Sequence, residues 1–120
     1  MAGIETSLKD AMTIDGAIGA ALGDYTSGMA LGTAGPTETL SVAAAATTDI
    51  LRAEMRALDL AGQGHQKLED ILISLTGQYH LIRPLTRHPG LFLYLMLDRN
   101  RSNLAMARHH ARRIEAGLEV

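Results

Sequence analysis

The sequence contains no cysteine and no tryptophan, and its aromatic residues are limited to three tyrosines and one phenylalanine. The absence of cysteine excludes disulfides, thiolate zinc sites and cysteine nucleophiles. No apolar run is longer than Leu91–Leu97, far short of the roughly 18 residues that a membrane-spanning helix needs. The segment Met1–Glu5 has no basic region before an apolar one, as a secretory signal would have. We therefore expect a soluble, cytoplasmic protein without an integral membrane segment.

Charge is unevenly distributed along a chain of 120 residues with a net charge of −2. Residues 1–70 carry four bases and ten acids (4 − 10 = −6), whereas residues 71–120 carry seven bases and three acids (7 − 3 = +4). Either the C-terminal part meets an acidic partner, or it pairs with the acidic half of the same chain, which the small total favours. Length and composition predict one globular domain spanning residues 1–120.

Hydrophobic spacing predicts three helices and five strands. Their ranges, in chain order, are a helix over 4–12, strands over 17–22 and 29–31, a helix over 37–60, strands over 68–75, 79–86 and 91–97, and a helix over 102–119. Gly28 provides the positive φ that the turn of the first hairpin needs, and Thr37 is expected to cap the central helix. The last strand is apolar at every position, which indicates a central strand covered on both faces. The predicted fold class is α+β, a three-layer α/β/α domain of order α-β-β-α-β-β-β-α with a five-stranded, mainly antiparallel sheet.

Two details of this fold are open or depend on periodicity alone. Pro84 lies in the fourth predicted strand, either at a position not needed for pairing or at a bulge. In the last helix, one stripe of residues is predicted to face inward and the opposite stripe to be solvated. The inward stripe is Leu104, Ala107, Ala111, Ile114 and Leu118, and the solvated one is Arg108, Arg112, Glu115 and Glu119.

The central helix carries two apolar stripes, although a helix on the outside of a small domain needs only one. The stripe suited to packing on the sheet is Leu40, Ala44, Thr47, Leu51, Met55 and Leu58; the second is Ala43, Ala46, Ile50, Ala53, Ala57 and Leu60. The alanines of the second stripe are either good helix formers on a solvated face or a surface that a second helix approaches closely. Ile50 and Leu60 favour an interface. We therefore expect Ala46, Ile50, Ala53 and Ala57 in a dimer interface.

The arginines of the central helix have two interpretations. Arg52 and Arg56 lie one turn apart, so they could reach a partner together or form local pairs with Asp49 and Asp59. The predicted partner-binding set is Asp49, Arg52, Arg56 and Leu60.

The segment Leu68–Leu75 is a second candidate for dimerisation. It follows a glycine-containing loop, is expected at the edge of the sheet, and alternates so that Ile71, Ile73 and Leu75 face one way and Leu68 and Leu72 the other. A bare hydrophobic edge invites aggregation unless another strand pairs with it. The dimer-interface prediction for this segment is Leu68, Asp70, Ile71, Leu72 and Ile73, with Glu69 and Asp70 as protecting charges or charges near the dimer axis.

The sequence lacks the patterns that accompany catalysis or cofactor binding. Its glycines form neither a phosphate-binding loop nor a dinucleotide fingerprint, since Gly16, Gly19 and Gly23 are expected in a strand where helices approach closely. His109 and His110 are neighbours and diverge on a helix, whereas a helical metal pair needs a spacing of three or four residues. Low aromatic content and a pI near 6.2 oppose nucleic-acid binding. We expect no enzyme activity, no cofactor, no metal and no nucleic-acid partner.

Four segments, in this order, resemble the Roadblock / dynein light-chain family, especially its bacterial members encoded near small Ras-like GTPases. They are Asp15-Gly16-Ala17-Ile18-Gly19-Ala20-Ala21-Leu22, Ser27-Gly28-Met29-Ala30-Leu31-Gly32, Tyr79-His80-Leu81-Ile82-Arg83-Pro84-Leu85 and Asn103-Leu104-Ala105-Met106-Ala107-Arg108. The resemblance implies a homodimer in which the third strands pair edge to edge, extending the sheet, with the central helices side by side. It implies a protein that binds and regulates a small Ras-like GTPase, or that serves as a scaffold for a motor or signalling complex.

Two other functions stay open at this point. One is a scaffold that binds its partner regardless of nucleotide, and the other is a small-ligand sensor. A sensor would need a polar cluster in the core, for which His80 and Tyr79 are the polar strand candidates.

Overall fold

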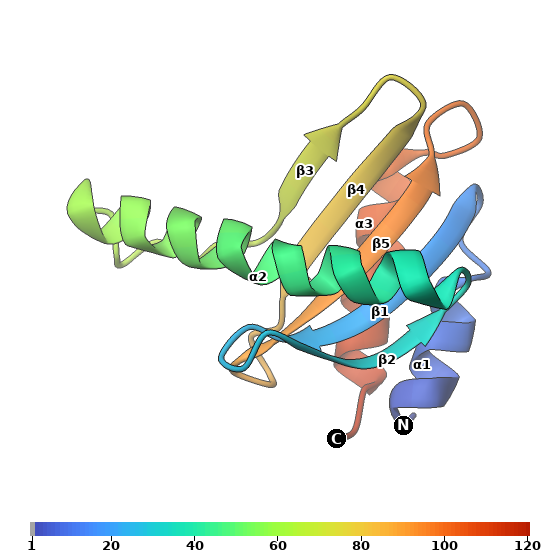
Figure 1. Cartoon of the computed structure of the whole chain (residues 1–120), viewed down its shortest axis with the longest axis horizontal. Coiled ribbons are helices and arrows are strands. Elements are labelled where there is room, and N and C mark those ends of the chain that lie inside the picture. Colours follow the sequence, from blue (N-terminus) through green and yellow to red (C-terminus); the bar gives the residue numbers. More distant parts are fainter. Residues whose placement is uncertain (1) are drawn as a thin grey trace.

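Residues 2–120, which the computed structural model describes apart from the side chain of Thr37, form three helices and five strands in the predicted order. Their bounds are α1 (Ile4–Ala11), β1 (Ala17–Asp24), β2 (Met29–Ala34), α2 (Thr37–Leu60), β3 (Ile71–Ser74), β4 (Gln78–Pro84), β5 (Leu91–Asp98) and α3 (Leu104–Gly117). The sheet has the order β2-β1-β5-β4-β3 with every pair antiparallel, so β5 is central as predicted. Helix α2 crosses one face of the sheet, and α1 and α3 lie on the other (Figure 1). In this described part of the chain, no helix has the length and hydropathy to cross a membrane.

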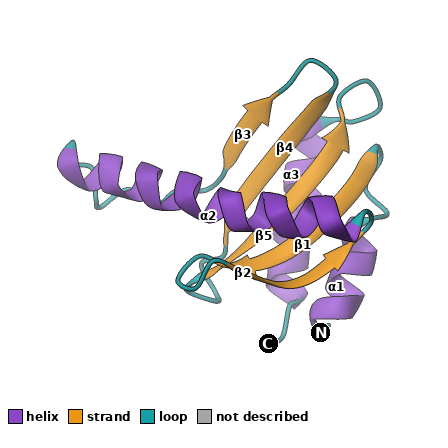
Figure 2. Ribbon diagram, in the orientation of Figure 1, coloured by secondary structure: helices purple, strands orange, loops and turns teal. Residues whose placement is uncertain are grey.

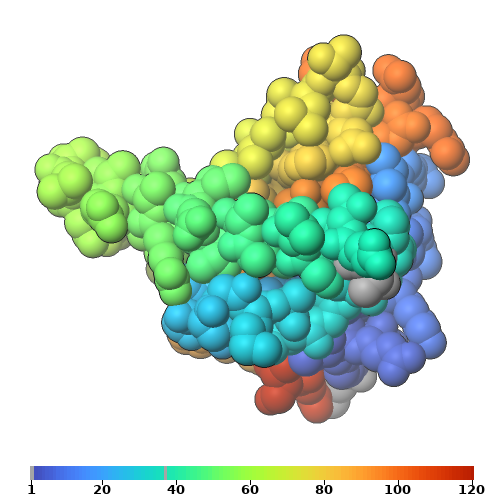
Figure 3. Space-filling model, in the orientation of Figure 1, coloured from blue at the N-terminus to red at the C-terminus, as the bar shows by residue number. Residues whose placement is uncertain are grey.

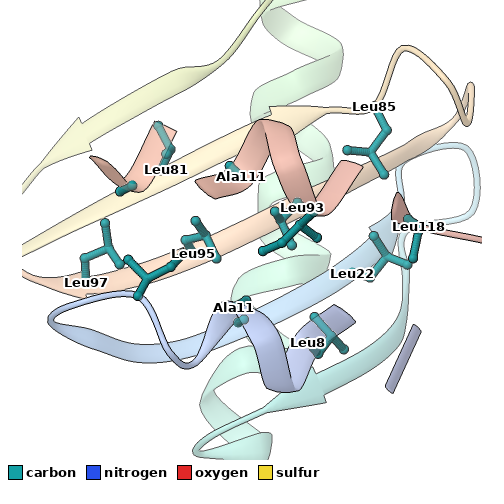
Figure 4. Close-up of a cluster of buried hydrophobic side chains, with 14 residues drawn as sticks. Leu8, Ala11, Leu22, Leu81, Leu85, Leu93, Leu95, Leu97, Ala111 and Leu118 are labelled. Atoms are coloured by element: carbon teal, nitrogen blue, oxygen red, sulfur yellow. The ribbon is translucent and has the colours of Figure 1, made fainter. Parts of the chain in front are cut away.

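The continuous apolar sequence of β5 serves two separate cores. Leu93, Leu95 and Leu97 belong to the cluster between the sheet and helices α1 and α3, which Figure 4 shows with Leu8 of α1 and Ala111 of α3. The alternate residues of the strand, from Phe92 to Met96, belong to the cluster between the sheet and α2. Because side chains of a strand point to opposite faces in turn, a strand covered on both faces is apolar throughout.

The β1–β2 hairpin is closed at Gly28, whose φ of +79° is the conformation that glycine adopts without steric cost. The Gly28 N–H donates to the carbonyl of Asp24 at 2.8 Å. Close approach explains a glycine earlier in β1, because a Cβ on Gly19 would lie 2.9 Å from the side chain of Leu40 on α2. Gly16, in contrast, precedes the strand and lies against the backbone of Arg101 instead of against a helix.

Helix α2 is only partly supported by the sheet. Its first half buries the predicted stripe down to Leu51, but none of its described residues after Leu51 is fully buried. Residues 53–60, here called the overhang, extend beyond the sheet into solvent (Figures 1 and 3). The helix begins at Thr37 with Pro36 in the N-cap position, so the prediction of Thr37 as the cap was wrong; its side chain lies outside the described residues.

The predicted third strand is too long. Strand β3 begins at Ile71, and residues 61–70 form a loop (Figure 2). Because Leu68 lies outside the strand, it does not follow the alternation: it packs on the α2 side, whereas Leu72 packs on the α1/α3 side. The prediction that these two leucines share a face was therefore wrong. Pro84 is the last residue of β4 and lies opposite Phe92 in regular register. The next residue, Leu85, donates its N–H to the carbonyl of Leu91 at 2.9 Å, so Pro84 occupies an alternate position whose N–H is not needed for pairing with β5.

Candidate functional site

The predicted partner-binding residues lie together on one face of α2. Asp49, Arg52, Arg56 and Leu60 line a shallow hollow of about 400 Å³ along the helix. The spacing explains this, since residues separated by three or four positions lie above one another on a helix. Two residues predicted for the dimer interface, Ala53 and Ala57, form the floor between them. All six residues are exposed in the single chain.

Arg52 is not free to extend into this hollow, because it binds the β1–β2 hairpin. Its Nε donates to the carbonyl of Tyr25 at 2.9 Å and its Nη2 to the carbonyl of Thr26 at 2.8 Å. Arg52 does not form the local pair with Asp49, which was one of its two interpretations. The sequence does not reveal the contact with the hairpin, because backbone carbonyls are acceptors that every residue offers.

The hairpin turn that Arg52 contacts is itself fixed by a carboxylate. Asp24 Oδ1 accepts from the backbone N–H of Thr26 at 2.8 Å and from its hydroxyl at 2.6 Å. These bonds from Thr26 lower the pKa of Asp24 from its ordinary value, since they favour the charged form. The turn, Arg52 and the middle of α2 are therefore held as one unit.

Arg56 differs from Arg52, because in the described part of the chain its guanidinium makes neither a hydrogen bond to the hairpin nor an ion pair. It lies one turn further along the overhang and is exposed. Of the two arginines predicted to contact a partner, Arg56 is the one whose guanidinium is available.

The second apolar stripe of α2 faces solvent. Ala46, Ile50, Ala53 and Ala57 are exposed, with Ile50 at 39% and Leu60, at the end of the stripe, at 81%. Beside the first half of this stripe runs an open groove of about 640 Å³, bounded by Val42 and Ala46 of α2 and by strands β4 and β5. An exposed apolar stripe next to a groove is a surface suited to a second element.

Three polar side chains form a hydrogen-bonded chain at the base of this groove. His80 Nδ1 lies 3.0 Å from the hydroxyl of Tyr94, and His80 Nε2 lies 2.8 Å from Gln78 Oε1. Since the Gln78 oxygen can only accept, Nε2 carries the proton and Nδ1 accepts from Tyr94. Burial lowers the pKa of His80 and raises that of Tyr94, which keeps both neutral.

The side chains of Gln78, His80 and Tyr94 hydrogen-bond to one another, which leaves few hydrogen-bonding groups for a small ligand. Tyr79, the other residue proposed for a sensor site, is not in the groove: its ring lies 5.0 Å from the guanidinium carbon of Arg99. The structure thus separates the two residues that a sensor site was expected to combine.

The β3 residues of the dimer prediction, Ile71, Leu72 and Ile73, are half-buried in the single chain. They pair only with β4, so the other edge of β3 is the end of the sheet. Leu75 N–H donates to the carbonyl of Gln78 at 2.9 Å, which closes the β3–β4 hairpin. Hydrogen-bonded and non-bonded pairs alternate along an antiparallel ladder, so the N–H groups of Leu72 and Ser74 point to the free edge.

Two residues predicted to be solvated on α3 are instead engaged. Glu115 is 4% exposed, and Arg108 is half-buried in an ion pair with Asp70, whose carboxylate is therefore not a free edge charge. Glu115 accepts from Arg83 Nε at 2.8 Å and from the backbone N–H groups of Thr86 and Arg87 at 2.7 and 3.1 Å. These partners are far from α3 in sequence, so periodicity within the helix could not reveal them. Among residues 2–120, no group of three or more histidine, cysteine, aspartate or glutamate side chains could hold a metal ion.

No protein-family model and no curated protein matches the sequence. Among solved structures, a Roadblock/LC7 domain from Streptomyces avermitilis superposes with a TM-score of 0.80 at 12% identity, over 96% of this chain and 93% of that one. MglB from Myxococcus xanthus gives a TM-score of 0.73 at 17% identity, over 92% of this chain and 77% of that one. The gliding protein MglB from Thermus thermophilus gives 0.75 at 18% identity, over 92% and 82% of the two chains.

These similarities confirm the family resemblance at the level of the fold. The chain is a Roadblock-like α+β domain. Its fold is also that of the two MglB proteins.

Proposed function

We propose that the protein is a non-enzymatic, homodimeric binding protein that regulates or recruits a small Ras-like GTPase. The observation that carries the proposal is the exposed face of α2, where Asp49, Arg56 and Leu60 lie along a shallow hollow that borders the alanine stripe proposed for the dimer. A surface that combines an available arginine, a carboxylate and an exposed leucine is suited to another protein rather than to a small molecule. The Roadblock/LC7 fold and the resemblance to bacterial members encoded near small GTPases supply the class of partner.

The homodimer is supported by two features that are complementary within one molecule. The free edge of β3 presents unpaired backbone groups, which a second copy can pair with antiparallel. The exposed stripe of Ala46, Ile50, Ala53 and Ala57 lies beside a groove, and the overhang is a helix segment without a sheet beneath it. A two-fold axis at the β3 edge would place the overhang of each protomer toward the groove of the other, which is the self-complementarity of a closed dimer.

Binding would act on the GTPase through its switch segments. The two α2 helices would contact these segments and change which conformation they occupy. Any acceleration of hydrolysis would come from ordering the catalytic groups of the GTPase itself. Arg52 is held by the hairpin carbonyls and is not available to enter a GTPase active site.

The first test of the proposal is capture of the partner in two nucleotide states. The immobilised protein is incubated with native lysate containing GDP or a non-hydrolysable GTP analogue, and bound proteins are identified by mass spectrometry. We expect a small Ras-like GTPase that is retained preferentially with the GTP analogue and is lost with Arg56→Glu. The matched control is Arg112→Glu, an exposed arginine on α3. A GTPase bound equally in both states would indicate the scaffold function, and no GTPase in either state would overturn the proposal.

The homodimer is tested separately, by sedimentation of the purified protein. Ser74→Pro removes an N–H that points to the free edge and leaves the ladder with β4 intact, so we expect it to shift the protein to monomer. Ser74→Ala is the control, since it keeps the backbone donor. A monomeric wild-type protein would contradict the homodimer.

A further inference from the structure

A groove runs along the seam between α1 and α3, on the face of the sheet opposite α2. It consists of two adjoining hollows, one of about 470 Å³ at the start of α3 and one of about 530 Å³ beside its second half. Thr13 and Arg113 line both hollows, so the two adjoin. Between them, His110 Nε2 of α3 lies 3.2 Å from Asp10 Oδ1 of α1. Helix α3 rises about 21 Å from Asn103 to Gly117, so the groove has room for about six residues of an extended peptide.

The walls of the first hollow are fixed by hydrogen bonds between distant segments. The Ser102 hydroxyl donates to the carbonyl of Asp98 at 2.7 Å, and the carbonyl of Asp15 at 3.2 Å shares the same proton as the longer acceptor. The Asp98 N–H donates to the carbonyl of Gly16 at 2.7 Å. Because these bonds tie the α1–β1 connection to the β5–α3 connection, the hollow is formed before any ligand arrives, and binding has little ordering to offset.

The lining of the first hollow is cationic. Arg101 and Arg113 both line it, and neither takes part in an ion pair among residues 2–120. His109 is exposed beside them, and Asp15 is a carboxylate of the same lining. A second carboxylate, Asp10, lines the adjoining hollow and contacts His110. Two of the seven arginines of residues 71–120 therefore line this concave surface.

The groove also has an apolar contact, since the side chain of Met106 lines it and is 63% exposed. A bare anion would use the arginines but leave Met106 in water. A membrane is flat and engages protruding side chains, whereas these cations line a hollow. No aromatic side chain lines it for nucleic-acid bases to stack on.

We propose that the α1/α3 groove binds an extended acidic peptide segment of a partner protein. Two of its carboxylates pair with Arg101 and Arg113, and an apolar side chain between them packs on Met106. The site is on the opposite face of the sheet from α2, so it is occupied independently of the proposed GTPase surface. The protein would then connect an acidic partner to whatever binds α2.

The test uses a fluorescein-labelled peptide, Glu-Asp-Glu-Leu-Asp-Glu, and the whole chain. Fluorescence anisotropy is measured at low salt and at about 0.15 M salt, where screening weakens charge contacts. We expect Arg101→Gln with Arg113→Gln to weaken binding at least tenfold, and Met106→Ser to weaken it about threefold. Arg112→Gln, an exposed arginine outside both hollows, should change it less than twofold.

Several results would overturn the proposal. These are no binding at millimolar peptide, equal binding of Gln-Asn-Gln-Leu-Asn-Gln, or an equal effect of Arg112→Gln. Binding of phosphatidylserine vesicles but not of the peptide, with the same dependence on Arg101 and Arg113, would assign the groove to a membrane instead. Backbone amide NMR shifts provide an independent check: the peptide should move Thr13, Ser102 and Met106, and shifts confined to α2 would place it elsewhere.

Discussion

The carboxylate of Asp70 receives both arms of the Arg108 guanidinium, with Nε 3.0 Å from Oδ2 and Nη2 3.2 Å from Oδ1. Asp70 immediately precedes β3, and Arg108 lies in the middle of α3. This two-point contact joins the last strand of the sheet to the helix beneath it. The edge proposed for dimerisation is thus held in place from the face opposite α2.

Asp70→Asn should loosen this attachment, because it keeps the shape of the side chain and removes its charge. Since Arg108 is about one-third exposed, we expect a loss of only about 0.5–1 kcal/mol in the free energy of unfolding. Hydrogen exchange of the β3 amides should become faster and the homodimer weaker. Glu69→Gln, at the exposed neighbouring position, is the control, and an equal effect of both variants would deny Asp70 this role.

Glu115→Gln should destabilise the domain more than any change at the α3 surface. The buried carboxylate accepts from Arg83, Thr86 and Arg87, and the amide would turn one acceptor into a donor facing donors. We expect a loss of about 2–3 kcal/mol in urea unfolding. Glu119→Gln, which is exposed, should change the free energy by less than about 0.5 kcal/mol.

The same carboxylate predicts how stability depends on acid. Burial alone raises the pKa of Glu115, but the N–H of Arg87, the hydrogen bond and charge of Arg83, and the N–H of Thr86 together lower it below its ordinary 4.5. A carboxyl whose folded-state pKa is lowered stabilises the fold above its unfolded-state pKa, and this stabilisation is lost as pH falls through the folded value. Unfolding measured from pH 6 to pH 2 should therefore show a loss below about pH 4.5 that Glu115→Gln lacks.

Arg52→Gln and Arg56→Gln should have different effects, although the two arginines look equivalent in the sequence. Arg52 holds the hairpin carbonyls, so its loss should speed amide exchange at Thr26 and Gly28. Arg56→Gln should leave that exchange unchanged and weaken GTPase capture. Faster hairpin exchange in both variants would contradict this division.

Ile50→Asp should weaken the homodimer at least tenfold in its dissociation constant, because it places a charge in the middle of the exposed stripe. The fold should survive, since Ile50 is not part of either core. Sedimentation and thermal unfolding measure the two effects. Ser41→Asp, on an exposed part of α2 outside the stripe, is the matched control. Normal dimerisation of the Ile50 variant would remove the argument for the stripe.

The elements were predictable because their signals are local. The unbroken apolar strand at Leu91–Leu97 identified the centre of the sheet, and Gly28 identified the hairpin turn. The start of β3 was misplaced because the positions of Leu68 and Asp70 are set by tertiary contacts. Leu68 packs on the α2-side cluster and Asp70 pairs with Arg108, and an alternation pattern carries no information on such contacts.

The site could be predicted only in part, for a similar reason. Helical spacing correctly grouped Asp49, Arg52, Arg56 and Leu60 on one face. It could not show that Arg52 binds the carbonyls of Tyr25 and Thr26, because every residue has a backbone carbonyl whatever its side chain. The dimer-interface and partner-binding roles themselves stay predictions.

Amide hydrogen exchange in the overhang of α2 depends on whether another protein covers this segment. Without a sheet beneath them, residues 53–60 depend for their helical shape on hydrogen bonds that open readily in water. Anything that covers this segment, whether a second copy or a GTPase, supplies the missing support and slows its exchange with deuterium. Deuterium exchange of these amides therefore allows assembly to be followed without an added label. The method suits a protein that has no tryptophan to serve as a fluorescent one.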